Sequence, residues 1–140
     1  MKRSLTITST LIALLSLPVL ADEQHTYTFS AGDNSLATEL CLAAVTNDLA
    51  ATKKKIRSIG LLDGVSSTQR VKNATRNISC NDMNLMTFTA EYGASDTFEY
   101  LNKRGVKMYR IDTDEVRIID LARQKRAALG GHTLVIISSK

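Results

Sequence analysis

Apolar residues recur every three or four positions along five stretches of this chain, which is the spacing of helices with one buried face. We therefore expect helices that begin at Leu36 and that span Leu49–Ile59, Asn84–Tyr92, Thr97–Arg104 and Val116–Leu129. Asparagine, aspartate and glycine lie between these stretches, and they favour turns and helix ends over helix interiors. The pattern predicts a mainly α-helical chain.

Short β-strands are predicted near both ends of the chain. Thr26–Ser30 alternates polar and aromatic residues, and Thr133–Ser138 is rich in β-branched residues. Val106–Ile111 alternates in a similar way and is predicted to be a strand or a hairpin arm. Leu61–Ser79 contains many Ser, Thr and Asn residues and is predicted to be irregular. The spacing leaves open whether the terminal strands pair with each other or with Val106–Ile111.

The first 21 residues have the parts of a cleavable secretory signal. Lys2 and Arg3 form a basic start, Leu11–Leu20 is an apolar core, and Ala21 is the small residue expected before the cleavage point. The apolar core is about half as long as the roughly 20 residues that a membrane-spanning helix needs. We expect cleavage after Ala21, which leaves residues 22–140 as a single periplasmic or secreted domain without membrane attachment.

The charge balance adds little to this picture. The chain has 18 Lys and Arg residues and 14 Asp and Glu residues, so that losing Lys2 and Arg3 with the signal leaves a formal charge of +2. Such weak basicity gives nucleic-acid binding little support. The basic runs Lys53–Arg57 and Arg123–Arg126 contain no aromatic residue, so we expect solvated helix faces rather than surfaces that stack bases.

Cys41 and Cys80 are the two cysteines of the chain. An even number of cysteines in an exported protein favours a disulfide. Closing a loop of about 40 residues would stabilise the fold by roughly 4 kcal/mol, since the bridge restricts the unfolded chain. The alternative is a pair of buried free thiols.

Recognisable catalytic and metal-binding motifs are missing from the sequence. It contains no glycine-rich phosphate loop, no His-Glu-x-x-His, no Gly-x-Ser-x-Gly and no Cys-x-x-Cys. Asp112, Asp114 and Glu115 cluster, but they lack the spacing and central glycine of a calcium loop. His25 and His132 stand alone near the ends of the expected mature chain. We therefore predict no catalytic residue, no metal site and no cofactor.

Short segments of similar pattern recur along the chain. Met86–Thr89 and Ile119–Ala122 both read apolar, polar, apolar, small, and they lie 33 residues apart. Leu40–Ala43 has the same pattern and lies 46 residues before Met86. The stretch predicted to be irregular accounts for the residues by which this spacing exceeds 33. The middle copy continues with a turn at Gly93, a second helix and a stop at Gly105. A period of 33 residues with two helices per unit resembles the ankyrin repeat.

The ankyrin resemblance covers about residues 35–125. It implies stacked helical hairpins, about two and a half repeats, with the N- and C-terminal strands at the open ends. The proline and the histidine of the family's Thr-Pro-Leu-His tetrad are absent from all three copies. The alternative is a plain helical domain whose short segments match by chance. The Cys-x-Ala-Ala element at Cys41 and the Cys-Asn-Asp element at Cys80 also resemble a group of small exported bacterial proteins of uncharacterised function.

The ankyrin resemblance implies a protein-binding function, because such stacks usually present their turn tips to a protein partner. Asp82 and Glu115 would be equivalent turn-tip positions, 33 residues apart, and are the candidate partner-binding residues. We therefore expect an exported, non-catalytic interaction module whose protein partner is unknown. One alternative is a small exported enzyme or enzyme inhibitor with a site assembled from scattered residues. Another is a structural or stress protein of the cell envelope.

Overall fold

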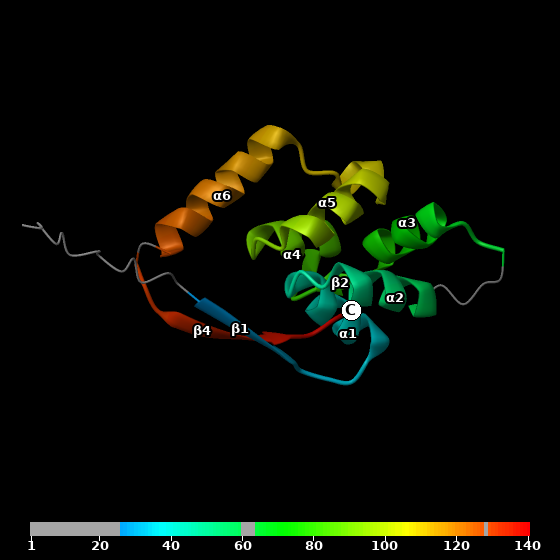
Figure 1. Ribbon diagram of the computed structural model, residues 1–140, viewed down its shortest axis with the longest axis horizontal. Helices are drawn as coiled ribbons and strands as arrows, with labels where there is room; N and C mark the ends of the chain where they lie inside the picture. The colour runs from blue at the N-terminus through cyan, green and yellow to red at the C-terminus, as the bar shows by residue number, and fades with distance from the viewer. Residues whose placement is uncertain (1–25, 60–63, 128) are drawn as a thin grey trace, which may run out of the picture.

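The structure is a computed structural model that describes residues 26–59, 64–127 and 129–140. The signal peptide predicted at 1–21 lies outside these residues. Figure 1 shows a mainly helical molecule with a few short strands, as the hydrophobic pattern predicts. Its elements in chain order are β1 (Thr26–Ala31), α1 (Leu36–Val45), α2 (Leu49–Ile59), α3 (Ser67–Asn77), β2 (Ser79–Cys80), β3 (Met83–Asn84), α4 (Leu85–Glu91), α5 (Ser95–Arg104), the 3₁₀ turn η1 (Lys107–Tyr109), α6 (Thr113–Ala127) and β4 (His132–Ile137).

The two terminal strands pair with each other. β1 and β4 run parallel along one side of the helices, in a register that places Thr26 opposite His132 and Ala31 opposite Ile137. β2 and β3 form a minimal antiparallel pair, and Cys80 also bridges to Ser139 beyond β4. The sheet therefore ties both ends of the described chain to the helical core.

Side-chain caps explain where several helices begin. Ser35 accepts a hydrogen bond from the amide of Thr38 at the start of α1, at 3.1 Å. Asn84 does the same for the amides of Met86 and Thr87 at the start of α4. Such caps satisfy amides that have no partner inside the helix.

The cap of α5 comes from another part of the chain. The carboxamide oxygen of Asn47 accepts hydrogen bonds from the amides of Asp96 and Thr97, at 2.9 and 3.1 Å. Ala94 occupies the capping position of α5 and makes no side-chain cap. The turn between α1 and α2 therefore fixes where α5 starts.

The hydrophobic core lies between α1 and the helices α3, α4 and α5. Its largest fully buried apolar side chains are Leu40, Val71, Leu85, Met86, Phe88, Leu101 and Ile137. A cluster of aromatic rings extends the core to the sheet, because Tyr27 and Phe29 of β1 meet Tyr92 edge to face with ring centroids 5.1 and 5.2 Å apart. Burial raises the pKa of Tyr92.

Two segments differ from the prediction. Part of the stretch predicted to be irregular, Leu61–Ser79, forms helix α3 with an N-cap at Ser66. Its buried residues Val71, Ala74 and Thr75 have helical spacing, but polar residues surround them in the sequence. The strand predicted at Val106–Ile111 is wrong, because this segment forms the turn η1. The two ends of the segment, Val106 and Ile111, are buried. Alternating polar and apolar residues between two buried ends fit a turn as well as a strand.

The ankyrin-like stacking is not confirmed. Met86 of α4 is fully buried, whereas Ile119 of α6 is only partly buried. Ile118 and Leu121, which flank Ile119 on α6, are exposed. The two positions that the 33-residue offset makes equivalent therefore lie in different surroundings. The coarser expectation of a mainly helical fold with short strands is confirmed.

Candidate functional site

The predicted disulfide is present. Cys41 in α1 and Cys80 in β2 are joined with their Cα atoms 5.8 Å apart, and both residues are fully buried. This pair confirms the disulfide prediction and excludes the alternative of free thiols. The bridge covalently links the first helix to the hairpin that leads into α4.

The candidate partner-binding residues Asp82 and Glu115 lie in different surroundings. Asp82 occupies the tight turn between β2 and β3, with φ at 63°, and its carboxylate pairs with Lys140 at 2.6 Å. The hydrogen bond that Lys140 donates to Asp82, together with the negative charge of Asp82, raises the pKa of Lys140. Glu115 is exposed in the first turn of α6, where its amide donates to Asp112. The β2–β3 hairpin and the start of α6 lie apart in Figure 1, so the structure does not bring the two residues together.

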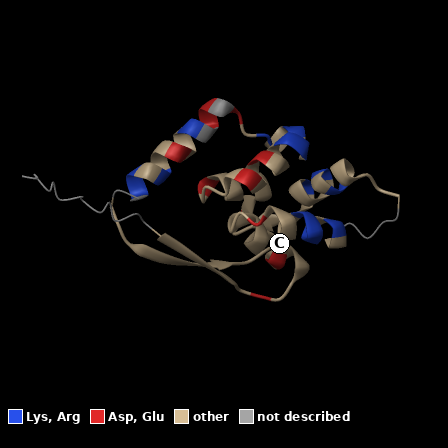
Figure 2. Ribbon diagram, viewed as in Figure 1, with Lys and Arg blue, Asp and Glu red and all other residues tan. Residues whose placement is uncertain are grey.

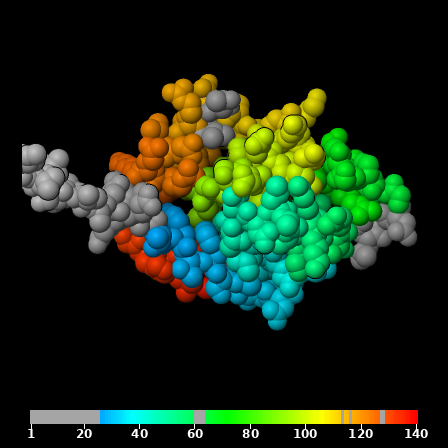
Figure 3. Space-filling model, in the orientation of Figure 1, coloured from blue at the N-terminus to red at the C-terminus, as the bar shows by residue number. Residues whose placement is uncertain are grey.

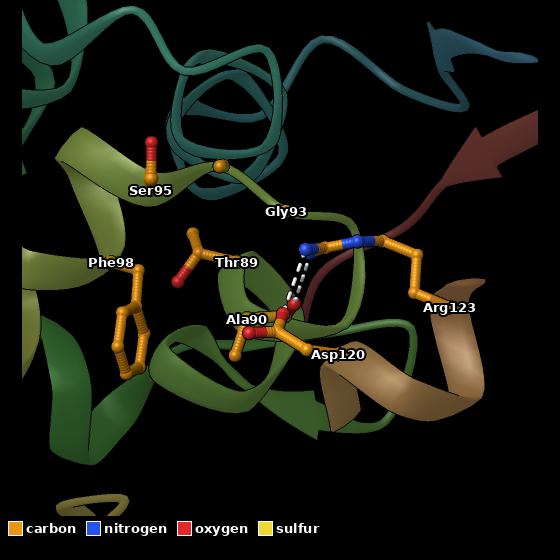
Figure 4. A pocket seen from close by; sticks show the side chains of 8 residues that line it. Thr89, Ala90, Gly93, Ser95, Phe98, Asp120 and Arg123 are labelled. Atoms are coloured by element: carbon orange, nitrogen blue, oxygen red, sulfur yellow. Dashed lines mark hydrogen bonds and ion pairs between the residues drawn. The ribbon is translucent and has the colours of Figure 1, made fainter. Parts of the chain in front are cut away.

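A small pocket lies between α4, α5 and α6, with a volume of about 150 Å³ (Figure 4). The guanidinium of Arg123 extends from α6, and it donates to the carboxylate of Asp120 at 2.7 Å and to the carbonyl of Ala90 at 3.3 Å. Gly93 makes room for it, since a Cβ there would lie 2.4 Å from an Arg123 nitrogen, and φ at +75° also favours glycine. The side chain of Arg123, fixed by these two hydrogen bonds, therefore forms one wall of the pocket.

The groups in this pocket are engaged with one another. Arginine remains protonated and cannot serve as a base, and the carboxylate of Asp120 is paired with it. The hydroxyl of Thr89 donates to backbone carbonyls of its own helix. Asp120 and Thr89 therefore already have partners, and these contacts give the enzyme alternative no support.

The described residues show neither a metal-binding cluster nor a membrane-spanning helix. Among them, no group of three or more His, Cys, Asp or Glu side chains could hold a metal ion. Within the same part of the chain, no helix is both long enough and apolar enough to cross a membrane.

A larger groove of about 490 Å³ lies between α3 and the end of α5 with the turn that follows. Figure 3 shows α3 and the α5–η1 segment next to each other at one end of the molecule. We call this the basic groove, because six of its lining residues are cationic and none is acidic. The six are Lys72, Arg76, Lys103, Arg104, Lys107 and Arg110.

Buried contacts hold the two walls of the basic groove together. Thr75, on α3, accepts a hydrogen bond from the amide of Val106 at 3.2 Å. Gly105 permits this approach, since a Cβ there would lie 2.6 Å from the carbonyl of Leu101 and 3.1 Å from Thr75. The side chain of Arg110 is fixed against the end of α5 by donating to the carbonyls of Asn102 and Lys103. The positions of the walls are therefore set by the fold.

The cations of the basic groove have no carboxylate partner among the described residues. Arg104 lies over the ring of Tyr100, at 4.9 Å from its centroid, and Lys53 lies over the same ring at 5.1 Å. In the part of the chain that the structure describes, Lys72, Arg76 and Lys107 form no hydrogen bond or ion pair with their side chains. These cations form no ion pair among the described residues, but Asp96 and Glu99 line a neighbouring pocket together with Lys103 and Arg104.

Although the net charge of the chain is small, its positive and negative residues are strongly separated along the sequence. Residues 49–77 and 100–110 contain eleven of the 18 Lys and Arg residues and a single acidic residue, Asp63, which lies outside the described residues. Figure 2 shows these cations gathered on α2, α3 and the end of α5, on one side of the molecule. Counting charge by segment could have found this site, whereas the total charge could not.

The fold and the groove together define a small, mainly helical, disulfide-bonded protein with a basic groove on its surface. Residues 40–122 match the family described as "Protein of unknown function (DUF3718)", and because this range is more than half of the chain, the protein belongs to that family. The matched range contains both cysteines and the whole basic groove, and it leaves out β1 and β4. Neither a curated protein nor a solved structure matches the chain.

Proposed function

We propose that this protein is an exported, non-catalytic binding protein that holds an acidic partner in the basic groove. The observation behind the proposal is that, among the described residues, six cations and no carboxylate line a groove of about 490 Å³. Export rests on the basic and apolar start of the sequence and on the disulfide, which forms most readily in oxidising compartments.

The energetics of the groove support a binding role. Like charges held near one another destabilise a folded protein, and proteins commonly accept such costs where function requires them. Three of the four cations of α6 differ, since Arg117, Arg123 and Arg126 each form an ion pair, whereas Lys125 has none among the described residues. An acidic partner would supply the missing counter-charges of the groove.

We infer that the partner is a protein rather than a nucleic acid. Among the described residues that line the groove, none has an aromatic side chain on which bases could stack. The proposal does not depend on ankyrin-like stacking, which stays a hypothesis drawn from the 33-residue period.

A matched pair of charge-reversal variants tests the proposal. The probe is a fluorescent sulfated octasaccharide, a polyanion whose binding requires no particular partner fold. We expect Lys72→Glu with Arg76→Glu to weaken its binding to the disulfide-bonded protein by about tenfold or more at low salt. The control, Lys54→Glu with Arg57→Glu, makes the same change of net charge on exposed residues of α2 that do not line the groove. Equal losses in the two variants would show that net charge alone governs binding and would refute the groove as the site.

Asp82 and Glu115 belong to a separate proposed contact, because neither lines the basic groove. If these two carboxylates contact a basic part of the partner, reversing both charges weakens retention of the partner in periplasmic pull-downs, while binding of the sulfated octasaccharide stays within about twofold. Unchanged retention would remove both residues from the proposed interface and leave the groove proposal intact.

A further inference from the structure

The basic groove has cations on both of its walls, and their spacing limits the shape of a partner. Lys72 and Arg76 lie four residues apart on α3, on one face of the helix, so that their backbones are about 6 Å apart along its axis. Lys103 and Lys107 lie on the opposite wall, at the end of α5 and in η1. A ligand that satisfies the groove must therefore present negative charge in two opposite directions.

An extended peptide meets this requirement. Its successive side chains point to opposite sides, and side chains two residues apart are separated by roughly 6.6 Å. That distance is close to the roughly 6 Å between Lys72 and Arg76 along α3. A run of four acidic residues in extended form would thus place two carboxylates toward each wall.

A helical partner fits the basic groove less well. A helix whose carboxylates form a stripe on one face would direct them toward one wall and leave the cations of the other wall without partners.

We infer that the basic groove binds an extended acidic segment of a partner protein, at least four residues long, whose side chains alternate between α3 and the α5–η1 wall. This inference rests on the proposed function and specifies the partner of the same site. It requires that both walls contribute and that the bound segment is not helical.

Binding of a labelled octaglutamate peptide to the wild-type protein and to three neutralised variants tests the first requirement. We expect Lys72→Gln with Arg76→Gln, and separately Lys103→Gln with Lys107→Gln, each to weaken binding by about three- to tenfold. The control Lys54→Gln with Arg57→Gln is expected to change it by less than twofold. A loss confined to one wall would overturn the two-sided contact.

Transferred NOE measurements on the same peptide test the second requirement. An extended bound peptide gives strong contacts between each Hα and the next amide proton, whereas a helical one gives strong contacts between successive amide protons. We expect strong contacts between each Hα and the next amide proton. These contacts should disappear when Lys72→Glu and Arg76→Glu are combined. A helical pattern would refute the extended form. If octaglutamate does not bind while the sulfated octasaccharide still binds in the groove, the acidic-peptide inference fails and the proposed function stands.

Discussion

Two sides of the molecule hold their cations differently. The sheet side is formed by α4, α6 and the β1–β4 sheet, and the basic side is formed by α2, α3 and residues 100–110. On the sheet side, Arg126 pairs with Glu91 at 2.6 Å, Arg123 with Asp120 at 2.7 Å, and Arg117 lies 3.8 Å from Asp114. On the basic side Lys55 pairs with Glu39, and the six cations of the groove have no described carboxylate partner.

The two sides are also joined to the core differently. Aromatic rings of β1 and α4 and the pairing of the terminal strands hold the sheet side. On the basic side, the walls of the groove meet at the buried hydrogen bond between Thr75 and Val106. A small total charge can therefore result from one side on which most cations are paired and another on which most cations have no carboxylate partner among the described residues.

The largest expected effect concerns the disulfide, which anchors the core that both sides share. Replacing Cys41 and Cys80 together with alanine is expected to lower the free energy of unfolding by about 4 kcal/mol, because the unfolded chain regains the freedom of a loop with a sequence separation of 39. Urea unfolding of the oxidised wild type and of the variant measures the difference. Equal midpoints would show that the bridge does not restrict the unfolded chain in this way.

The hydrogen bond between the groove walls gives the next largest effect. Thr75 and Thr89 are both buried, and both donate to carbonyls of their own helices, but Thr75 also accepts from the amide of Val106. Thr75→Val leaves that buried amide unpaired and is expected to cost about 1–3 kcal/mol more than Thr89→Val. Urea unfolding of the two variants supplies the comparison. Equal losses would mean that the bond across the groove adds nothing to stability.

Neutralising cations should change stability in opposite directions on the two sides. Lys72→Gln with Arg76→Gln removes like charges one helical turn apart and is expected to raise the free energy of unfolding by a few tenths of a kcal/mol. Arg126→Gln removes an ion pair and is expected to lower it by roughly 0.2–1 kcal/mol. The measurement is urea unfolding at low salt, and 1 M salt should remove most of both effects. A loss of stability in both variants would contradict the contrast between the sides.

The smallest effect concerns Asp33, in the turn between β1 and α1. Hydrogen bonds from Ser35, and then from Thr38, lower the pKa of Asp33 from its ordinary value of 3.8. Because the folded-state pKa lies below the unfolded one, the carboxylate stabilises the fold fully above about pH 4, and this stabilisation is lost as the pH falls through the lowered pKa. An NMR titration of the Asp33 carboxyl carbon, compared with the acid unfolding of Asp33→Asn, measures this. A midpoint at or above the ordinary value would contradict it.

Elements with dense apolar patterns could be predicted from the sequence, and those with sparse patterns could not. Leu49–Ile59 was predicted with the bounds that α2 has. Helix α3 was overlooked because Val71, Ala74 and Ile78 are the only apolar residues at helical spacing among many polar ones. The parallel pairing of β1 with β4 depends on the folding of everything between them, and strand spacing contains no such information.

The site was harder to predict than the fold. The cysteine pair followed from its even number and the expected export. The basic groove was missed, because its cations come from two segments that are brought together by the packing of α3 against α5. Gly105 permits that packing through the space that its missing side chain leaves, and no local pattern in the sequence reveals such a requirement.

Mapping of amide chemical shifts during titration of the wild-type protein with octaglutamate shows directly whether the basic groove binds an acidic peptide. We expect the largest shifts on α3 and on residues 103–110. These shifts should saturate, and they should disappear when Lys72→Glu and Arg76→Glu are combined. Shifts centred on α6 or on the β1–β4 sheet, or spread evenly over all the cationic residues, would contradict binding in the basic groove.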